Sequence, residues 1–186
     1  MRQIKEVPQF YKDYLKKEKP SVWDVFSLQV ELNKQIAKDE QFEVDAYTQQ
    51  RLSSKQRLID HYYKRSLFPE LTFDYNNFFV ANHNVKYGAD YKDNHVKKID
   101  YTNMYNPALS MDKFIFLESG EIYPKIKDDK LAIKSIEIFN LNDDRLISRR
   151  YGLFKSALSL NKYLDSKEVL KTLKFELHSG VKDVLN

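Results

Sequence analysis

The sequence predicts an α+β protein in which N-terminal helices pack with a mainly antiparallel sheet and a C-terminal helix follows. Three observations indicate this class: helical patterns predominate in the first 65 residues, alternation and aromatic runs begin near residue 71, and helical spacing returns in the last part of the chain. Helices and strands that are segregated along a chain are typical of α+β folds. We expect one domain over residues 1–186, with 1–65 as a candidate helical subdomain and 71–186 as the sheet-containing part.

The composition indicates a chain that folds around an aromatic-rich core. Of the 186 residues, 42% are hydrophobic and 14% are aromatic, whereas disordered chains are poor in aromatic side chains. The absence of cysteine excludes disulfide bonds, thiolate zinc sites and a cysteine nucleophile. The net charge of +4 arises from 31 basic and 27 acidic residues, and so mild an excess gives only weak support for nucleic-acid binding.

The sequence lacks the usual motifs of targeting, membrane spanning and cofactor binding. The start of the chain has no apolar core of signal-peptide length, and no run approaches the ~18 apolar residues of a membrane span. We therefore expect a cytoplasmic protein without membrane contact. No Walker loop, dinucleotide fingerprint or G-x-S-x-G elbow is present, so no cofactor and no catalytic residue are predicted.

Three helices are predicted in the N-terminal part. Pro8 is placed to begin the first helix, and Pro20 ends that region. Apolar residues from Leu28 to Ile36 then follow the spacing of one helix face. The predicted helices cover residues 8–17, 21–38 and 45–65.

Strands are predicted in the middle of the chain. Residues 71–88 are aromatic and partly alternating, which favours one or two strands, and residues 88–112 are expected to be irregular. Ser119 and Gly120 are suited to the turn of a hairpin. The predicted strands of this hairpin cover 113–117 and 121–126, and further strands are predicted at 131–141 and 145–150.

The C-terminal part is predicted to be helical. We expect a short helix over residues 154–164. Asp165 and Glu168 have the spacing of a capping box, and apolar residues from Val169 to Leu177 follow a helical stripe. Gly180 is expected to end this last helix.

The run NHNVKYGADYKDNH, residues 82–95, contains two histidines and two aspartates of the type that binds metal ions. A metal-dependent nuclease needs such groups to activate water, but their spacing fits no zinc or nuclease pattern, and Asn, Asp and Gly also suit a polar loop. We therefore predict a loop and no metal site, with His83, Asp90, Asp93 and His95 as weaker candidates. A second acidic set is better explained as a turn and a strand, which would place Lys134 and Glu137 on opposite faces; its members are Glu118, Asp128, Asp129, Lys134 and Glu137.

Cations interleaved with tyrosines form two candidate contact surfaces. One lies on the predicted helix 45–65 and the other near residue 150, and such cations could contact phosphates while the tyrosines stack on bases. A solvated charged face is the alternative. The candidate contact residues are Arg51, Lys55, Arg57, His61, Lys64, Arg65, Arg145, Arg149, Arg150 and Tyr151.

Aromatic residues form a further candidate surface, because Tyr and Phe are frequent at the centres of protein interfaces. The candidates are Tyr75, Phe78, Tyr87 and Tyr91. A core built from these rings is the alternative.

The leading hypothesis is a non-enzymatic binding protein that occupies the surface of a host protein or a protein–nucleic-acid complex. The richness in Lys, Asn, Ile and Tyr is typical of AT-rich genomes, which favours an inhibitor or adaptor encoded by a phage or mobile element; an anti-CRISPR-type protein is one example. Direct nucleic-acid binding in a regulatory role is the second hypothesis, and a metal-dependent nuclease is the third.

Overall fold

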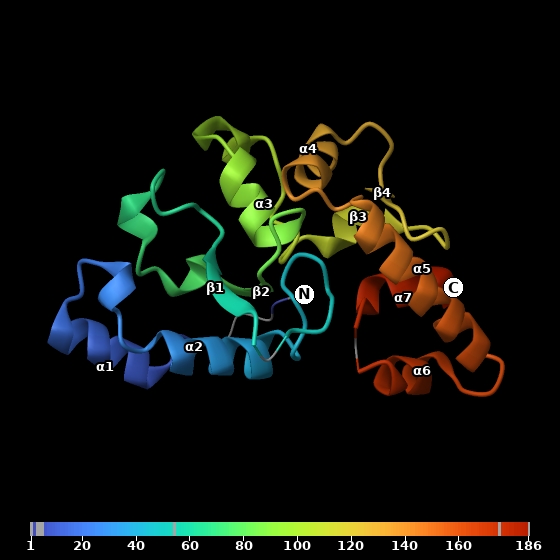
Figure 1. Ribbon diagram of the computed structural model, residues 1–186, viewed down its shortest axis with the longest axis horizontal. Helices are drawn as coiled ribbons and strands as arrows, with labels where there is room; N and C mark the ends of the chain where they lie inside the picture. The colour runs from blue at the N-terminus through green and yellow to red at the C-terminus, as the bar shows by residue number, and fades with distance from the viewer. Residues whose placement is uncertain (1, 3–5, 54, 175, 186) are drawn as a thin grey trace.

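The computed structural model describes residues 2, 6–53, 55–174 and 176–185, and over these residues it has the predicted α+β architecture. Helices lie at both ends of the chain and around two small antiparallel sheets (Figure 1). The helices are α1 Gln9–Glu18, α2 Gln29–Gln35, α3 Gly88–His95, α4 Lys130–Ile138, α5 Asp144–Leu160, α6 Ser166–Thr172 and α7 His178–Leu185. The strands are β1 Arg57–His61 paired with β2 Phe78–Asn82, and β3 Phe114–Phe116 paired with β4 Ile122–Pro124.

The β1–β2 sheet separates two hydrophobic cores. Because successive side chains of a strand point to opposite faces, Phe78 and Val80 of β2 pack with α2, whereas Phe79 and Ala81 pack with Tyr47 and the central core. The sheet therefore lies as a layer between α2 and α3, as Figure 1 shows. Residues of these two helices line the candidate site.

The first predicted helix is confirmed as α1, but the second is wrong as a continuous helix. Residues 23–25 form a 3₁₀ turn, α2 follows, and a π-helical turn ends the segment at Glu40. The rings of Trp23 and Phe26 stack at 5.0 Å, and Trp23 also packs edge-on against His61 at 4.4 Å. Burial of both rings in one core explains why this segment interrupts the helix.

The predicted helix over residues 45–65 is wrong, because this region forms a loop followed by β1. The Asp45 side chain is buried and accepts hydrogen bonds from the backbone N–H groups of Tyr47 (3.0 Å), Thr48 (2.9 Å) and Asn82 (2.6 Å). Such side-chain-to-backbone bonds compete with helical hydrogen bonds. Asp45 thus ties the loop to β2.

The predicted strands at 131–141 and 145–150 are also wrong, since these residues lie in α4 and α5. Asp129 caps α4 by accepting from the N–H groups of Leu131 (3.0 Å) and Ala132 (3.2 Å), and Asp143 caps α5 through the N–H of Arg145 (3.0 Å). An aspartate at this position stabilises a helix start by about 1 kcal/mol. The helix predicted over 154–164 is confirmed in part as the second half of α5.

Four further local predictions have mixed outcomes. The hairpin is confirmed as β3–β4, and the capping box of Asp165 and Glu168 is present, with bonds of 2.8 and 3.4 Å. Residues 88–95 form α3 rather than an irregular loop, because Ala89 and Lys92 are buried, and packing overrides weak helix propensity. Gly180 lies inside α7, against Phe154, and does not end the helix.

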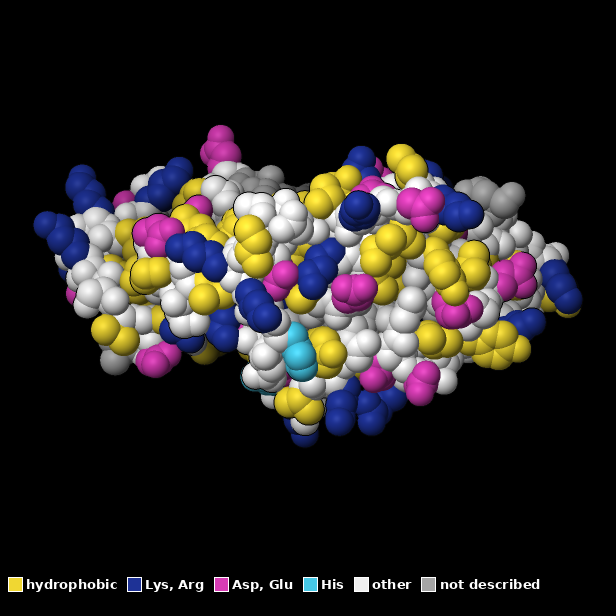
Figure 2. All heavy atoms as spheres, turned by 90° about the horizontal axis from the view of Figure 1, so that it is seen from above, with side chains coloured by type: hydrophobic (Ala, Val, Ile, Leu, Met, Phe, Trp, Pro, Cys, Tyr) yellow, Lys and Arg dark blue, Asp and Glu magenta, His cyan; other side chains and the backbone are white. Residues whose placement is uncertain are grey.

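The surface around α3 and α4 carries charges of both signs. Figure 2 shows Lys and Arg side chains interspersed with Asp and Glu side chains over this face. Among the described residues, no helix combines the length and apolar character needed to cross a bilayer.

Candidate functional site

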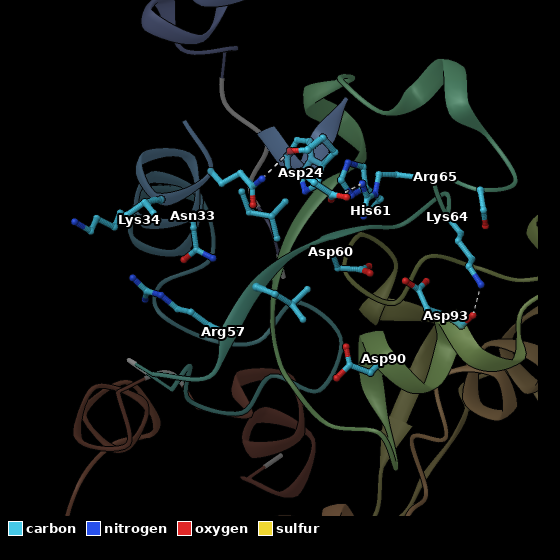
Figure 3. A pocket seen from close by; sticks show the side chains of 16 residues that line it. Asp24, Asn33, Lys34, Arg57, Asp60, His61, Lys64, Arg65, Asp90 and Asp93 are labelled. Atoms are coloured by element: carbon cyan, nitrogen blue, oxygen red, sulfur yellow. Dashed lines mark hydrogen bonds and ion pairs between the residues drawn. The ribbon is translucent and has the colours of Figure 1, made fainter. Parts of the chain in front are cut away.

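A groove of about 1030 Å³ follows the outer side of β1, and we call it the β1 groove. All five residues of β1 line it, which indicates that the strand presents its edge as well as its side chains (Figure 3). One wall comes from α2 and the 3₁₀ turn at Trp23, and the other comes from Asp90 and Asp93 of α3. The volume lies just above the range of ~300–1,000 Å³ that is typical of ligand pockets.

The α2 wall is apolar and basic near Arg57. Val30 is 65% exposed, and Lys34 on the next turn is exposed beside it. Arg57 forms an ion pair with Glu43 at 3.2 Å. This end of the groove therefore offers apolar surface and cations to a partner.

At the other end, Trp23 forms part of the floor beside an exposed ion pair. Arg65 lies 3.4 Å from Asp24 and 5.9 Å from the centre of the Trp23 ring. Exposed pairs of this kind contribute little to stability, about 0–1 kcal/mol. Both side chains can therefore exchange partners when a ligand binds.

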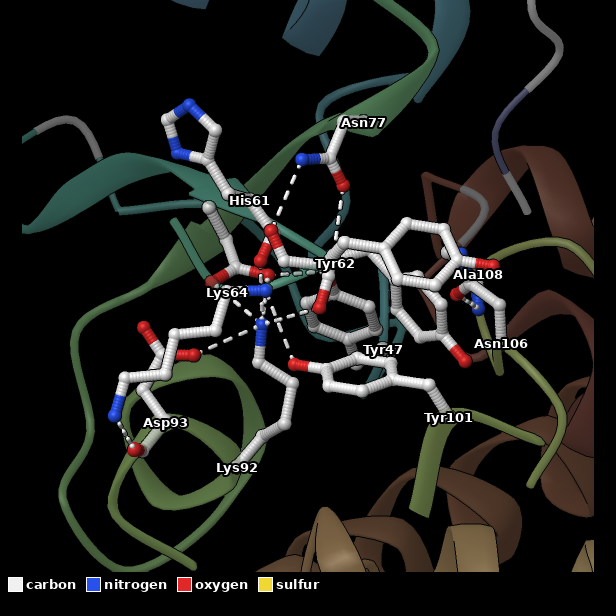
Figure 4. Close-up of polar contacts among 12 residues, drawn as sticks. Tyr47, His61, Tyr62, Lys64, Asn77, Lys92, Asp93, Tyr101, Asn106 and Ala108 are labelled. Carbon is white, nitrogen blue, oxygen red and sulfur yellow. Dashed lines mark hydrogen bonds and ion pairs between the residues drawn. The ribbon is translucent and has the colours of Figure 1, made fainter. Parts of the chain in front are cut away.

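A fully buried lysine joins α3 to β1 behind the groove (Figure 4). The Nζ atom of Lys92 lies 3.0 and 2.9 Å from the two carboxylate oxygens of Asp60, and it donates to the carbonyl oxygens of His61 (2.7 Å) and Tyr62 (3.1 Å). The Tyr47 hydroxyl also donates to Asp60. Buried charges persist only when they are paired and hydrogen-bonded, and this network meets that condition, so Lys92 and Asp60 hold the groove in shape.

The α3 wall has an excess of negative charge. The Oδ1 atom of Asp93 lies 3.0 Å from Nζ of Lys92 without hydrogen-bond geometry, and Lys64 donates to the Asp93 carbonyl at 2.6 Å. Burial, followed by the negative charge of Asp60, raises the pKa of Asp93. The carboxylates of Asp60 and Asp93 share the Lys92 ammonium group, and a third carboxylate, that of Asp90, lines the same wall.

Burial lowers the pKa of His61 from 6.5 to about 4, and the positive charges of Arg65 and Lys92 act in the same direction. In the neutral ring, Nε2 donates to the Thr72 carbonyl at 2.9 Å. Between pH 6.5 and about 4 the unfolded chain binds a proton that the folded protein does not, so acid favours unfolding.

We expect protonation of His61 in the unfolded chain to remove up to about 3 kcal/mol of stability over this pH window. Urea unfolding at several pH values measures this effect. On acidification, His61→Phe should lose less unfolding free energy than the wild-type protein, whereas the exposed control His83→Phe should lose as much as the wild-type protein.

Four predicted contact residues line the β1 groove: Arg57, His61, Lys64 and Arg65. They lie on β1 and the turn after it, not on one face of a helix. Arg51 and Lys55 lie outside the groove on the preceding loop, where Arg51 donates to the carbonyls of Phe42 and Lys174, both at 3.4 Å. The helix prediction was wrong, but a short stretch of sequence still brought these cations together.

The other predicted cations lie on α5, across the molecule from α2 (Figure 1). Arg149 is bound to Glu176 at 2.6 Å, and Arg145 lies 3.6 Å from Asp143. Arg150 is 1% exposed and donates to the Gly120 carbonyl at 3.1 Å, and burial lowers its pKa to about 10. As a contact residue Arg150 is therefore a wrong prediction, because it is part of the core; Tyr151 is exposed beside Lys155.

The aromatic surface is wrong for two of its four members. Tyr75 and Phe78 are buried, because Phe78 packs against Trp23 at 5.1 Å and Tyr75 donates its hydroxyl to Glu40. Tyr87 and Tyr91 are half-buried, and Tyr91 stacks on His95 at 3.9 Å. The core interpretation thus holds for the first pair.

The metal candidates have other contacts. His83 lies 3.3 Å from Asp90, and His95 Nδ1 donates to the Tyr91 carbonyl at 2.8 Å. Within the described parts of the chain, no three His, Asp or Glu side chains are arranged to hold a metal ion. In the second acidic set, Asp129 caps α4, whereas Lys134 and Glu137 lie 3.9 Å apart on one helix face rather than on opposite faces of a strand.

A second cavity of about 490 Å³ lies beside α7 and is lined by residues such as Val44, Phe114 and Asp183. Asp183 accepts a hydrogen bond from the backbone N–H of Phe116 at 3.0 Å, and burial raises its pKa. Because this carboxylate anchors α7 to β3, the β1 groove is the better candidate site.

Sequence reasoning missed the residues that shape the groove, namely Trp23, Asn33, Lys34 and Lys92. Lys92 is 32 residues from Asp60, and no local pattern signals that pairing. No family model matches the chain, and no curated protein matches it in sequence.

Proposed function

We propose that the chain is a non-enzymatic binding protein whose β1 groove contacts a host protein, either alone or within a protein–nucleic-acid complex. One observation carries this proposal: a groove of about 1030 Å³ combines apolar surface from Val30 and the half-buried Ile59 with charges of both signs on its walls. Protein interfaces combine an apolar centre with a polar rim in the same way. The central charged group, Lys92, is neutralised and buried, which supports a role in shape rather than in chemistry.

The carboxylates of the groove favour a protein partner over direct contact with nucleic acid. Nucleic-acid sites collect cations against phosphates, whereas Asp24, Asp90 and Asp93 lie among the cations of this groove. Two of the cations, Arg57 and Arg65, already pair with acidic side chains. A phosphate backbone would meet repulsion from the α3 wall.

An inhibitor or adaptor encoded by a phage or mobile element, as in the anti-CRISPR-type example, is the concrete form of this proposal. A protein of that kind would act sterically, by filling a surface that its target needs. The groove would supply the anchor, and the surrounding charges would steer association.

Site-specific photo-crosslinking in the host cell tests this function. We expect a photo-crosslinking amino acid in place of Lys34, in the groove wall, to give a discrete crosslinked partner protein. The same amino acid in place of Tyr163, which is 84% exposed on the far side of the chain, is the matched control and should not give that product.

Two outcomes of this experiment would count against the proposal. Equal products from both positions, or none from the groove, would show that the groove is not the contact site. A crosslink from position 34 to nucleic acid instead of protein would favour the regulatory nucleic-acid-binding alternative.

A further inference from the structure

The outer edge of β1 has backbone groups that no strand pairs within the described part of the chain. Tyr62 N–H donates to Asn77 at 3.0 Å, and His83 N–H donates to Gln56 at 2.8 Å. These bonds set the alternation of the antiparallel ladder, so Leu58 and Asp60 direct their backbone groups to β2. Arg57, Ile59 and His61 consequently direct their N–H and C=O groups toward the groove.

Among the described residues, only one of these groove-facing groups has a partner at hydrogen-bond distance. The His61 carbonyl accepts from Lys92 at 2.7 Å. The N–H and C=O groups of Arg57 and Ile59, and the His61 N–H, remain for a ligand. They form a row with the spacing of a β-ladder.

The outer edge of β2 is, by contrast, closed by side chains. Gln41 accepts from the N–H of Val80 and donates to its carbonyl, both at 2.8 Å. Asp45 accepts from the N–H of Asn82 at 2.6 Å, and Arg2 donates to the Phe78 carbonyl. Proteins commonly block a strand edge to prevent unwanted pairing. This fold blocks one edge of its central sheet and leaves the other open inside a groove.

The groove has a volume of about 1030 Å³ beside β1, which leaves space for a further chain segment along that strand. The sheet lies between α2 and α3, and both helices extend past β1 as groove walls (Figure 3). A second copy of this chain is poorly suited to this place, because its own β1 is recessed between the same two helices and those helices would collide. A flexible extended segment has no such obstacle.

The wall charges define the side chains of such a segment. A strand added to β1 would alternate its side chains between the α2 wall, where Lys34 and Arg57 lie, and the α3 wall, where Asp90 and Asp93 lie. Ile59 packs against the hydrophobic cluster on the α2 side of the sheet, so the groove surface next to Ile59 is apolar. The complementary segment has basic residues on one face, and an acidic and an apolar residue on the other.

We propose that the β1 groove binds an extended segment of a partner protein by strand addition to β1, with basic side chains of the segment facing α3. This inference rests on the proposed function and specifies how the partner binds. Main-chain hydrogen bonds to Arg57 and Ile59 give the affinity, and the two charged walls give the specificity.

The test uses a fluorescein-labelled peptide of sequence Gly-Thr-Lys-Val-Lys-Glu-Gly. Antiparallel to β1, its valine lies opposite Ile59 and its glutamate opposite Arg57, with both lysines facing α3. We expect fluorescence anisotropy to give a Kd in the range of about 1–100 μM. The charge-exchanged peptide Gly-Thr-Glu-Val-Glu-Lys-Gly should bind at least about tenfold more weakly.

N-methylation provides the matched pair that separates strand addition from other docking modes. Methylation of the valine nitrogen removes an N–H that points at β1, and we expect about tenfold weaker binding. Methylation of the first lysine nitrogen removes an N–H that points away from β1, so binding should change by less than about threefold. Neither peptide requires a protein variant.

On the protein side, Ile59→Pro removes a groove-facing N–H and no bond of the β1–β2 ladder, which is the position where an edge strand tolerates proline. Peptide binding should fall at least about tenfold while the circular dichroism spectrum stays unchanged. If this variant does not fold, the methylated peptides still decide the question.

Equal affinity of the two methylated peptides, or no binding of the parent peptide up to about 1 mM, would refute strand addition. Crosslinking of a partner protein from position 34 does not depend on strand addition. Failure of this inference is therefore distinguishable from failure of the proposed function. A protein that sediments as a dimer and loses dimerisation in Ile59→Pro would identify a second copy as the occupant instead, and would also overturn the inference.

Discussion

Lys92→Met is expected to lower the free energy of unfolding by about 3–5 kcal/mol. The substitution leaves the Asp60 carboxylate buried, at 3% exposed, and among the described residues only the Tyr47 hydroxyl remains as its hydrogen-bond donor. It also removes the donor to the carbonyls of His61 and Tyr62. Loss of one partner of a buried pair costs far more than the pair itself contributes. Urea unfolding followed by circular dichroism at neutral pH measures the change.

The double variant Lys92→Met/Asp60→Asn shows whether the loss comes from the stranded charge. The amide that replaces the Asp60 carboxylate is neutral and can still accept from Tyr47, so we expect at least half of the lost stability to return. Lys86→Met, at an exposed lysine, is the matched control and should change stability by less than about 0.5 kcal/mol. A loss below about 1 kcal/mol in Lys92→Met would contradict the buried network.

Features with complete local signals were predicted correctly. Pro8 marked α1, Ser119 and Gly120 marked the β3–β4 hairpin, and Asp165 with Glu168 marked the start of α6. In each case, the residues that determine the structure are close together in the sequence. The α+β class followed from the same patterns.

The errors arose where two periods fit one segment or where a distant contact decided the outcome. Ile136 and Ile138 have the two-residue spacing of a strand face, whereas Ile133 and Ile136 have the three-residue spacing of a helix face, and the cap at Asp129 decides for α4. For the region after residue 45, the bond from Asn82 to Asp45 spans 37 positions. No local period contains that information.

The candidate site was only partly predictable for the same reason. Arg57, His61, Lys64 and Arg65 are neighbours in sequence, so they cluster on a strand and turn as they would have on a helix. The groove itself depends on α2, β1 and α3 packing in layers. The contrast between a closed β2 edge and an open β1 edge depends on Gln41, which is 39 residues from Val80.

Gly120→Ala is expected to lower the free energy of unfolding by about 3 kcal/mol or more. Gly120 has φ +93°, a conformation that costs other residues roughly 1–3 kcal/mol. A Cβ atom there would also overlap the Ile147 carbonyl oxygen and lie 3.0 Å from the backbone nitrogen of Tyr151. Because both neighbours belong to the backbone of α5, they cannot rotate away, and the β3–β4 hairpin would be displaced from the helix. Thermal unfolding should show the loss.

Gly152→Ala is the matched control, because Gly152 lies in α5, the helix that Gly120 contacts. Gly152 lies inside α5, and apart from its chain neighbours and the adjacent backbone of that helix, no heavy atom of the described residues lies within 4 Å of an added Cβ. Alanine in a helix interior is more stable than glycine by about 0.5–1 kcal/mol, so this variant should gain stability. In Gly120→Ala, by contrast, the displaced hairpin would also carry the Gly120 carbonyl away from Arg150, which donates to it at 3.1 Å. The buried guanidinium group of Arg150 would then lack that acceptor. Equal melting temperatures for both variants would show that the hairpin does not pack on α5 as described, because only one of the two substitutions meets a rigid neighbour.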